Sequence, residues 1–142
     1  MAVKYPAGEF GLALALRTRR RPSQILGFAF TRRTWANNFM LEFLAASPAA
    51  GHVIKGVGRA LMQTLSRIAL SLHCSEMWGE CTELSQGFYV SLKETTGRAS
   101  GRNQRPAEVR DRFQFTREEL SLMVEGSQVR MEGCEPDSLD EP

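Results

Sequence analysis

The sequence predicts a single α/β domain with a mixed, mostly antiparallel central sheet and flanking helices. Three apolar segments, 10–16, 25–30 and 39–46, are joined by short polar connections, which is typical of antiparallel strands. Beyond residue 56 the apolar residues change from alternation to the three- and four-residue spacing of a helix. A length of 142 residues, 42% hydrophobic and 24% charged, is that of one ordinary globular domain.

The first half of the chain predicts three strands in succession. Phe10–Leu16 alternates large and small residues, which indicates a strand. A polar connection with a proline leads into the second strand, Ile25–Phe30. Asn37 and Asn38 suit the next turn, because asparagine tolerates left-handed backbone angles. The third strand, Phe39–Ala46, follows that turn and completes an antiparallel meander.

A helix, a strand and a second helix are predicted next. Four apolar residues give the first helix one apolar face: Leu61, Leu65, Ile68 and Leu72. The strand Ser75–Cys81 should pair parallel to the third strand through a crossover. Thr82 can cap the second helix, and Glu83 in its first turn suits the helix dipole. Three residues spaced by four predict the apolar stripe of that helix: Leu84, Phe88 and Leu92.

The last third of the chain has weaker signals. Residues 93–110 are rich in Gly, Arg, Thr and Asn and predict a loop. Arg112–Thr116 predicts a final strand, and the capping-box pattern Thr116–Glu119 predicts a short helix after it. The acidic residues 132–142 predict a mobile tail, so the domain is expected to span residues 1–131.

The connection between the third strand and the first helix carries the strongest functional signal. Gly56 and Gly58 lie where the helix begins. Glycines let a backbone approach a ligand closely, and the first N–H groups of a helix have no partner within it. The helix dipole adds partial positive charge, so this arrangement suits a diphosphate. A plain tight turn explains the same two glycines. Neither a Walker-type loop nor a dinucleotide-binding fingerprint is present.

A second segment, Trp78–Leu92, reads as a strand running into a helix. Together with the glycine pair and the Phe88-Tyr89 pair, it resembles the GNAT family of acyl-CoA-dependent N-acetyltransferases. In that family a strand, a Gln/Arg-x-x-Gly-x-Gly/Ala loop and a helix are followed by a strand and a helix carrying Asn-x-x-Ala-x-x-Phe/Leu-Tyr. The resemblance covers about residues 10–92 and fits in order and spacing.

The chain departs from the family pattern at four positions and at its N-terminus. Four residues differ from those that the family prefers: Val53 for Gln or Arg, Thr82 for Asn, Ser85 for Ala, and Lys93 for the first residue of a Gly-Phe pair. The strand and two helices that usually precede the family core are largely absent. In the family those helices help form the acceptor pocket, so a dimer partner or the 93–110 loop would have to complete it.

The resemblance implies that acetyl-CoA is the co-substrate, with its pyrophosphate on the loop amides and its pantetheine arm beside the third strand. A splay between the third strand and the strand Ser75–Cys81 would give that arm its slot. Nine residues are expected to contact the cofactor: Ala46, Ile54, Lys55, Gly56, Val57, Gly58, Arg59, Thr82 and Ser85. Lys55 and Arg59 would add charge to the phosphates, or they are solvated loop residues.

Three residues are candidates for proton transfer. Tyr89 matches the family tyrosine whose hydroxyl protonates the leaving thiolate; an interior tyrosine is the alternative. Glu42 is the only charge in an apolar strand, so partial desolvation would raise its pKa toward that of a base. By alternation Glu42 shares a face with Met40 and Leu44; a salt bridge with Arg32 or Arg33 is the alternative explanation. Glu80 is the second candidate base, at the end of the fourth strand and facing the predicted cleft. His52 is more often a plain loop residue than a base.

Trp35 and Trp78 could line an acceptor pocket, although tryptophans more often pack in a core or at its rim. The sequence does not identify the acceptor beyond a small-molecule or peptide amine, expected to be a primary amine. An inactive coenzyme-binding or interaction module with the same fold is an alternative function. A homodimer is also possible.

Composition bounds the remaining function classes. Three cysteines and two histidines lack metal-binding or disulfide spacing, so no metal is expected: Cys74, Cys81, Cys134, His52 and His73. No apolar run spans a membrane and no signal peptide is recognised, so a cytoplasmic location is expected. Arginine clusters allow a nucleic-acid binder, but lysine is scarce, the tail is acidic and the net charge is only +2, so this function is disfavoured.

Overall fold

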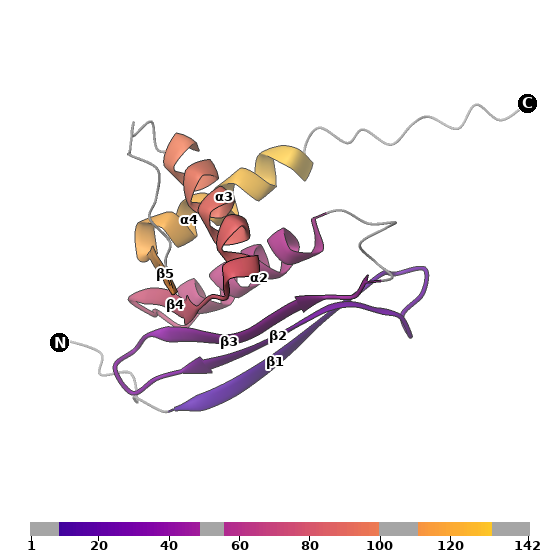
Figure 1. Cartoon of the computed structure of the whole chain (residues 1–142), viewed down its shortest axis with the longest axis horizontal. Helices are drawn as coiled ribbons and strands as arrows, with labels where there is room; N and C mark the ends of the chain where they lie inside the picture. Colours follow the sequence, from indigo (N-terminus) through magenta and orange to yellow (C-terminus); the bar gives the residue numbers. More distant parts are fainter. Residues whose placement is uncertain (1–8, 49–55, 100–110, 132–142) are drawn as a thin grey trace, which may run out of the picture.

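The structure is a computed structural model of the chain, and it describes residues 9–48, 56–99 and 111–131. Figure 1 shows the helices gathered on one side of the long strands of the sheet. The elements are, in chain order, β1 Phe10–Arg17, β2 Ile25–Arg33, β3 Phe39–Ala46, α2 Val57–Ser71, β4 Glu76–Glu80, α3 Glu83–Ala99, β5 Arg112–Thr116 and α4 Arg117–Met131. The strands form one sheet in the order β1-β2-β3-β4-β5.

The predicted meander is confirmed. β1 pairs antiparallel with β2, and β2 pairs antiparallel with β3. Asn37 takes the left-handed conformation expected of the β2–β3 turn, with φ of 62°. Its side chain accepts hydrogen bonds from the Arg33 guanidinium and donates one to the carbonyl of His73 at 2.6 Å. This turn is therefore tied to the end of α2.

The second half of the sheet also follows the prediction. β4 pairs parallel to β3 across the α2 crossover, and β5 pairs antiparallel to β4. The predicted fold class, a mixed and mostly antiparallel sheet with flanking helices, is thus confirmed by the topology.

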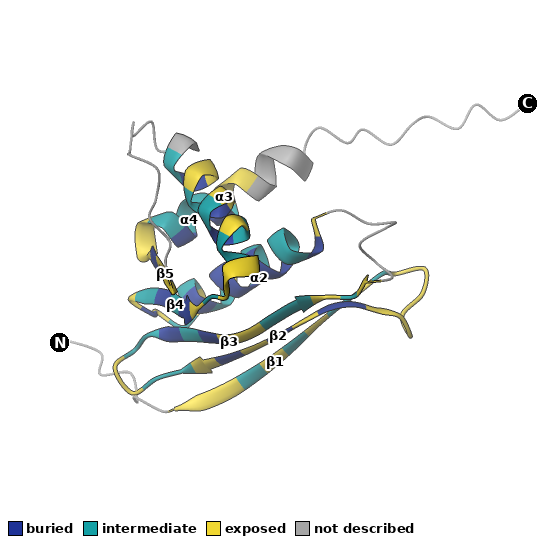
Figure 2. Ribbon diagram, viewed as in Figure 1, coloured by how far each residue is buried: buried dark blue, intermediate teal, exposed yellow. Residues whose placement is uncertain are grey.

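The core lies between the helices and the sheet, as the dark-blue strand segments facing α2 in Figure 2 indicate. The sheet contributes Phe39 and Leu41 from β3, and Phe113 and Phe115 from β5, all almost fully buried. α2 contributes its predicted apolar face, on which Leu61 and Leu65 have no exposed surface. Burial of side chains of this size is the main stabilising contribution to folding.

α3 is longer than predicted. Residues 93–99, expected in a loop, continue the helix to Ala99. The ammonium group of Lys93 lies 2.8 Å from a Glu119 carboxylate oxygen on α4, and Thr96 is buried with its hydroxyl donating to the Leu92 carbonyl. The ion pair with α4 and the burial of Thr96 outweigh a composition that favours a loop. Residues 100–110 lie outside the described part of the chain.

The predicted apolar stripe of α3 is wrong at its first residue. Leu92 is buried and Phe88 is half-buried, but Leu84 is 99% exposed in the first turn of the helix. Spacing alone places Leu84 on the stripe, but no described element covers that end of α3.

The capping box before α4 is confirmed. The amide of Glu119 donates to the Thr116 hydroxyl at 3.3 Å, and the Thr116 amide donates to the Glu119 carboxylate at 2.8 Å. The predicted tail, 132–142, lies outside the described residues. None of the helices in the described part of the chain is long and apolar enough to cross a membrane.

Gly27 on β2 controls how closely α2 approaches the sheet. A Cβ at this position would lie 2.6 Å from a methyl of Val57, 2.9 Å from one of Leu61 and 3.0 Å from the Ala45 carbonyl oxygen. Any larger residue here would push the start of α2 away from the end of β3. A glycine within a strand often marks such a close approach.

Replacing Gly27 with alanine should therefore destabilise the protein by about 1–3 kcal/mol, the usual cost of overpacking a core. The measurement is urea unfolding of the Gly27→Ala variant. Gly87→Ala is the matched control, since a Cβ at Gly87 in α3 meets nothing within 4 Å and alanine favours a helix by about 0.5–1 kcal/mol. A Gly27→Ala variant as stable as wild type would show that α2 is not held against β2 in this way.

Candidate functional site

β3 and β4 pair over only part of their length. The pairing runs from Phe39–Met77 to Leu41–Gly79 and stops there, although β3 continues to Ala46. We call this point, where the two strands part, the fork. Beyond it the Cys81 amide donates to the Asp111 carbonyl at 2.9 Å, so the chain after β4 bonds to the residue before β5. The splay expected from the sequence is therefore present.

A β-bulge lies at the fork on β3. Phe30 is opposite Phe43 and Thr31 is opposite Leu41 in the pairing register. No β2 residue therefore lies directly opposite Glu42. A bulge turns the following side chains to the opposite face. Met40, Glu42 and Phe43 therefore point away from the helices. The expectation that Glu42 shares a face with Leu44 and opposes Phe43 is wrong, because alternation fails at the bulge.

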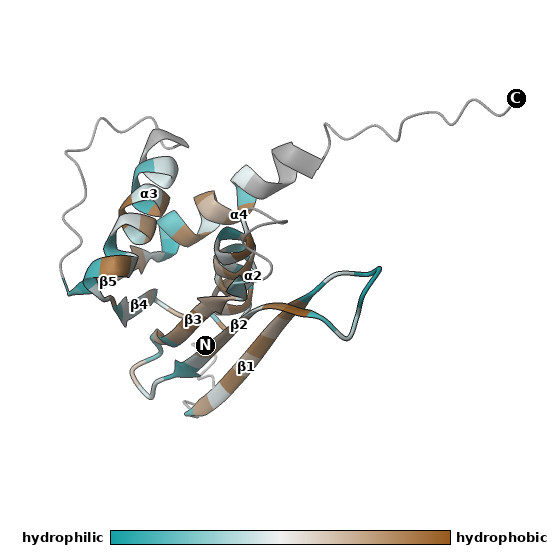
Figure 3. Cartoon of the chain, turned by 45° about the vertical axis from the view of Figure 1, so that its right-hand side comes forward, coloured by the Kyte–Doolittle hydropathy of each residue, from teal (hydrophilic) through white to brown (hydrophobic). Residues whose placement is uncertain are grey.

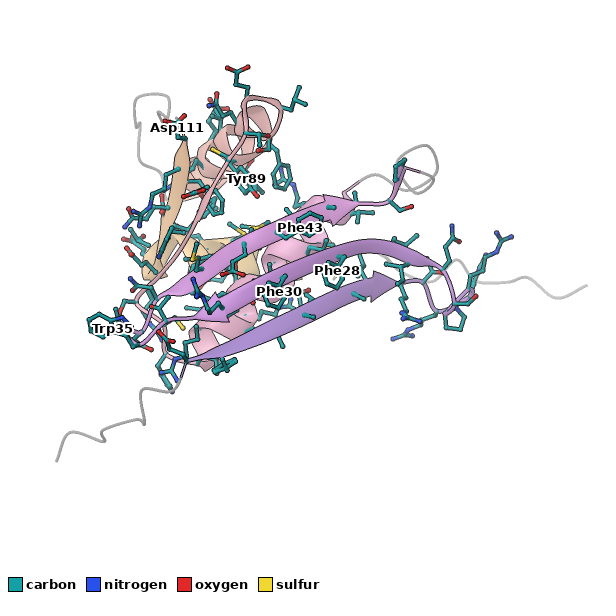
Figure 4. All side chains as sticks on the ribbon, turned by 60° about the horizontal axis from the view of Figure 1, so that its bottom comes forward. Phe28, Phe30, Trp35, Phe43, Tyr89 and Asp111 are labelled. Carbon is teal, nitrogen blue, oxygen red and sulfur yellow. The ribbon has the colours of Figure 1, made fainter. Side chains whose placement is uncertain are left out.

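The two sides of the sheet near the fork differ in the side chains that they carry and in how far these are exposed. We call the side of β1, β2 and β3 away from the helices the outer face. Figure 4 looks onto it and shows Phe28, Phe30 and Phe43 lying over the strands. These rings are 37%, 36% and 53% exposed, and the centroids of Phe28 and Phe43 are 6.1 Å apart. The helix side, in contrast, holds the buried core and Tyr89.

The N-terminus of α2 lies next to the end of β3. Gly56 is the N-cap residue, in the left-handed conformation with φ of 87°, and no side chain caps the helix. The first turn contains no acidic residue. Gly27 is opposite Ala46 in the β2–β3 register and touches Val57, so the helix start sits directly over the last residues of β3. Gly58 faces the ring of Phe88 on α3, where a Cβ would lie 3.1 Å from it.

Two groups of the predicted cofactor residues, the end of β3 and the start of α2, lie side by side. Ala46 ends β3, and Gly56, Val57, Gly58 and Arg59 form the start of α2. Ile54, Lys55 and His52 lie outside the described residues. An uncapped helix end with no nearby acidic side chain in its first turn is electrostatically suited to an anion. The residues present therefore fit the diphosphate of a coenzyme A molecule.

Thr82 and Ser85 bond mainly to each other. The Thr82 amide donates to the Ser85 hydroxyl at 2.9 Å, and the Ser85 and Gln86 amides both donate to the Thr82 carbonyl at 3.0 Å. The Ser85 hydroxyl thus caps the Thr82 amide, whereas the Thr82 hydroxyl, the predicted cap of α3, bonds to the Ser85 hydroxyl at 3.2 Å. The cofactor contacts predicted for both residues remain predictions.

Tyr89 lies on the helix side of the fork. It is 5% exposed and its ring stacks on Phe113 of β5, with centroids 3.9 Å apart and an interplanar angle of 10°. The Phe113 ring in turn lies against Gly79, the last β4 residue that pairs with β3. Burial raises the pKa of Tyr89 to about 12, and the nearby Cys81 thiol adds to this rise. The tyrosine hydroxyl is therefore protonated at all physiological pH values.

The two candidate bases lie at the surface. Glu42 is exposed, and its carboxylate is 3.1 Å from the Arg32 guanidinium. The expected desolvation of Glu42 is wrong, since the bulge turns it outward, and the alternative salt bridge with Arg32 is present. Glu80 is exposed at the end of β4, opposite Arg112 in the register. The catalytic role of either residue remains a prediction.

Trp35 differs from the expected packing, whereas Trp78 agrees with it. Trp35 is 74% exposed in the β2–β3 turn, so it belongs to no core. Trp78 on β4 is half-buried, and the Arg112 guanidinium lies 4.0 Å above its ring. Figure 4 shows Trp35 at one end of the outer face, away from Tyr89.

Several residues that shape the site were not singled out by the sequence. Gly27 seats α2, Gly79 leaves room for the Phe113 ring and the Leu41 carbonyl, and Phe113 supports Tyr89. Each glycine interrupts an apolar strand, which is a recognisable sign of close approach. Neither the bulge at Glu42 nor the position of Cys81 beside Tyr89 has a sequence signal. Among the described residues, no group of three or more His, Cys, Asp or Glu side chains is placed to hold a metal ion.

Comparison with known proteins gives likenesses in structure only. No protein-family model matches the sequence, and no curated protein matches it. An acetyltransferase from Bacillus cereus ATCC 14579 aligns over 53% of this chain and 50% of its own, with 16% identity and a TM-score of 0.46. For Tetrahymena GCN5 the shares are 56% and 48%, with 14% identity and a TM-score of 0.48.

A third solved structure, nourseothricin acetyltransferase, aligns over 66% of this chain and 58% of its own, with 18% identity and a TM-score of 0.49. The matched region thus spans about half the length of each of these proteins.

The exposed Arg32–Glu42 pair should contribute little to stability. Its side chains are 47% and 30% exposed, and pairs of this kind are worth about 0–1 kcal/mol. Glu42→Ala should change the unfolding free energy by less than about 1 kcal/mol. Glu119→Ala is the comparison: it loses both the Lys93 pair and the cap of α4, and should cost about 1–2 kcal/mol more. Urea unfolding measures the unfolding free energy of both variants. A large loss of stability for Glu42→Ala would contradict the small contribution expected of this exposed pair.

Proposed function

We propose that the protein is an N-acetyltransferase that binds acetyl-CoA at the fork and transfers its acetyl group directly to an amine. The fork carries the proposal. It combines a strand edge on β3 beyond Leu41, an uncapped helix N-terminus over Ala46, and a buried tyrosine on the same side.

The cofactor is proposed to lie along the helix side of the fork. The amides at the start of α2, Gly56–Arg59, would bind the pyrophosphate, with Arg59 adding charge. The unpaired backbone of β3 from Glu42 to Ala46 would bind the pantetheine arm by adding it as a strand, because its polar groups facing β4 have no partner there. The bound cofactor supplies the activated acetyl thioester.

The acceptor amine is proposed to approach from the outer face. Its nitrogen lone pair attacks the thioester carbonyl, the C–S bond breaks, and an amide and a thiolate result. The thiolate becomes the free thiol by taking a proton from water. The proton released by the amine would pass to Glu42, Glu80 or water. Glu42 is best placed of the two carboxylates, because it sits on the bulge at the fork itself. A chain that binds the cofactor without turnover is the alternative function.

Tyr89 is proposed to donate a hydrogen bond to the departing sulfur. With a pKa of about 12, its hydroxyl holds its proton more tightly than an ordinary phenol. Complete proton transfer to a thiolate with a pKa of about 8.5 would be unfavourable in water. Hydrogen bonding still stabilises the negative charge that develops on sulfur, and a desolvated site strengthens that bond.

Acetyl-CoA should raise the melting temperature, because a ligand that binds only the folded state stabilises it. The discriminating variant is Arg59→Glu. A carboxylate in the first turn of α2 suits the helix dipole by about 0.3–1 kcal/mol, so the unliganded variant should be at least as stable as wild type. It should nevertheless lose most of the shift produced by acetyl-CoA, because it repels the phosphates. No shift for wild type at saturating acetyl-CoA, or an equal shift for Arg59→Glu, contradicts the proposed binding mode.

Tyr89→Phe should bind acetyl-CoA normally but release thiol about 10- to 1000-fold more slowly with an amine that wild type accepts. The raised pKa also predicts a pH profile. Because the tyrosine loses its proton only near pH 12, the wild-type rate should rise as the amine deprotonates and not fall through pH 10. Thiol release measured across this range checks both statements. A wild-type rate that falls near pH 9–10, or a fully active Tyr89→Phe variant, would contradict the role given to Tyr89.

A further inference from the structure

We propose that two copies of this chain associate through their β1 strands, so that their sheets join into one continuous antiparallel sheet. Among the described residues β1 is an edge strand, because only β2 pairs with it. Figure 3 shows β1 as the outermost strand, coloured as hydrophobic along most of its length. An open edge presents a row of unpaired amide and carbonyl groups that another strand can bind.

The central part of β1 lacks the features that protect natural edge strands. Between Glu9 and Arg17 the strand has no charge and no proline. Lysines, prolines and inward charges are the usual devices that prevent pairing at an edge. The strand is also long, with eight residues paired to β2.

The polar backbone groups of β1 point alternately to its two sides. In a strand of L-residues, the amide and carbonyl of one residue point to the same edge of the strand. Which edge this is follows from the chain direction and from the face of the sheet on which the side chain lies. For β1 the residues with side chains on the outer face direct their amide and carbonyl groups away from β2. These residues are Gly11, Ala13 and Ala15. Their small side chains leave that edge sterically open.

The side chains of β1 are arranged symmetrically about Ala13. Pairing of two β1 strands around Ala13 places Glu9 of one copy opposite Arg17 of the other, twice by symmetry. On the helix side it sets Leu12 opposite Leu14 and Phe10 opposite Leu16. A two-fold interface needs this kind of self-complementarity, since the same patch must serve both partners. Opposite charges at the two ends favour an antiparallel second copy over an unrelated strand.

A second copy would also cover apolar surface that the monomer leaves open. Leu12, Leu14 and Leu16 are only half-buried, because α2 lies mainly over β2 and β3. Figure 2 shows β1 without fully buried positions. In the joined sheet these leucines pack against those of the partner, and the two aromatic outer faces form one continuous surface.

Sedimentation velocity of the wild-type chain over a concentration series tests the proposal, with a reversible dimer expected. Ala13→Pro removes the Ala13 amide, which lies at the centre of the proposed interface and points away from β2. The pairing of β1 with β2 should therefore remain, because edge strands tolerate proline. It should be monomeric with an unchanged circular dichroism spectrum. Ala13→Val keeps the amide and should dimerise like wild type. A wild type that is monomeric throughout, or an Ala13→Pro variant that is folded and dimeric, overturns the proposal.

Cross-linking gives a readout that does not depend on how proline is tolerated. In the proposed register Ala13 lies opposite Ala13 of the second copy, whereas the two Ala15 residues are about 13 Å apart along the strands. A short bismaleimide should therefore link Ala13→Cys dimers much more efficiently than Ala15→Cys dimers in the same background. Glu9→Arg should weaken association severalfold and Glu9→Arg with Arg17→Glu should restore it. Equal linking of both cysteine variants overturns the register, and with it the proposal.

Discussion

The short pairing of β3 with β4 is the constraint on which the rest of the site depends. It ends at Leu41 and Gly79, where a bulge at Glu42 bends β3 and the Cys81 amide bonds to Asp111 on the β5 side. A parallel pair that continued to the ends of both strands would satisfy the backbone of β3 and close the sheet. Because it stops early, the part of β3 from Glu42 to Ala46 has backbone polar groups that β4 does not pair, and such groups need partners.

Two close contacts place α2 and Tyr89 relative to this edge of β3. Gly27 lets the start of α2 rest on the last residues of β3, so the positive end of the helix dipole lies beyond the fork. Gly79 lets the Phe113 ring approach β4, and that ring carries the buried Tyr89. The anion-binding end and the hydroxyl therefore belong to the helix side, whereas the bulge presents Glu42 on the outer face. In the proposed reaction the cofactor on the helix side and the amine on the outer face would meet at the fork.

Much of the fold was predictable, because its elements are marked by local patterns. Alternation and turn residues predicted the strands, helical spacing predicted the crossover helix, and the capping box at Thr116 predicted the start of α4. The errors have tertiary causes: contacts with α4 extend α3 through Lys93, and the bulge reverses the face of Phe43 and exposes Glu42. The position of Tyr89 near the fork agrees with the sequence, but its raised pKa depends on burial against Phe113, which no sequence pattern specifies.

The central claim is that the amides at the start of α2 bind the diphosphate of a coenzyme A molecule. Backbone amide NMR during a titration with coenzyme A tests it most directly. The account predicts saturable shifts that are largest at Gly56–Arg59, with smaller ones along β3 from Phe43 to Ser47. Shifts confined to the arginine-rich connection between β1 and β2, or no saturable shifts at the start of α2, would contradict it.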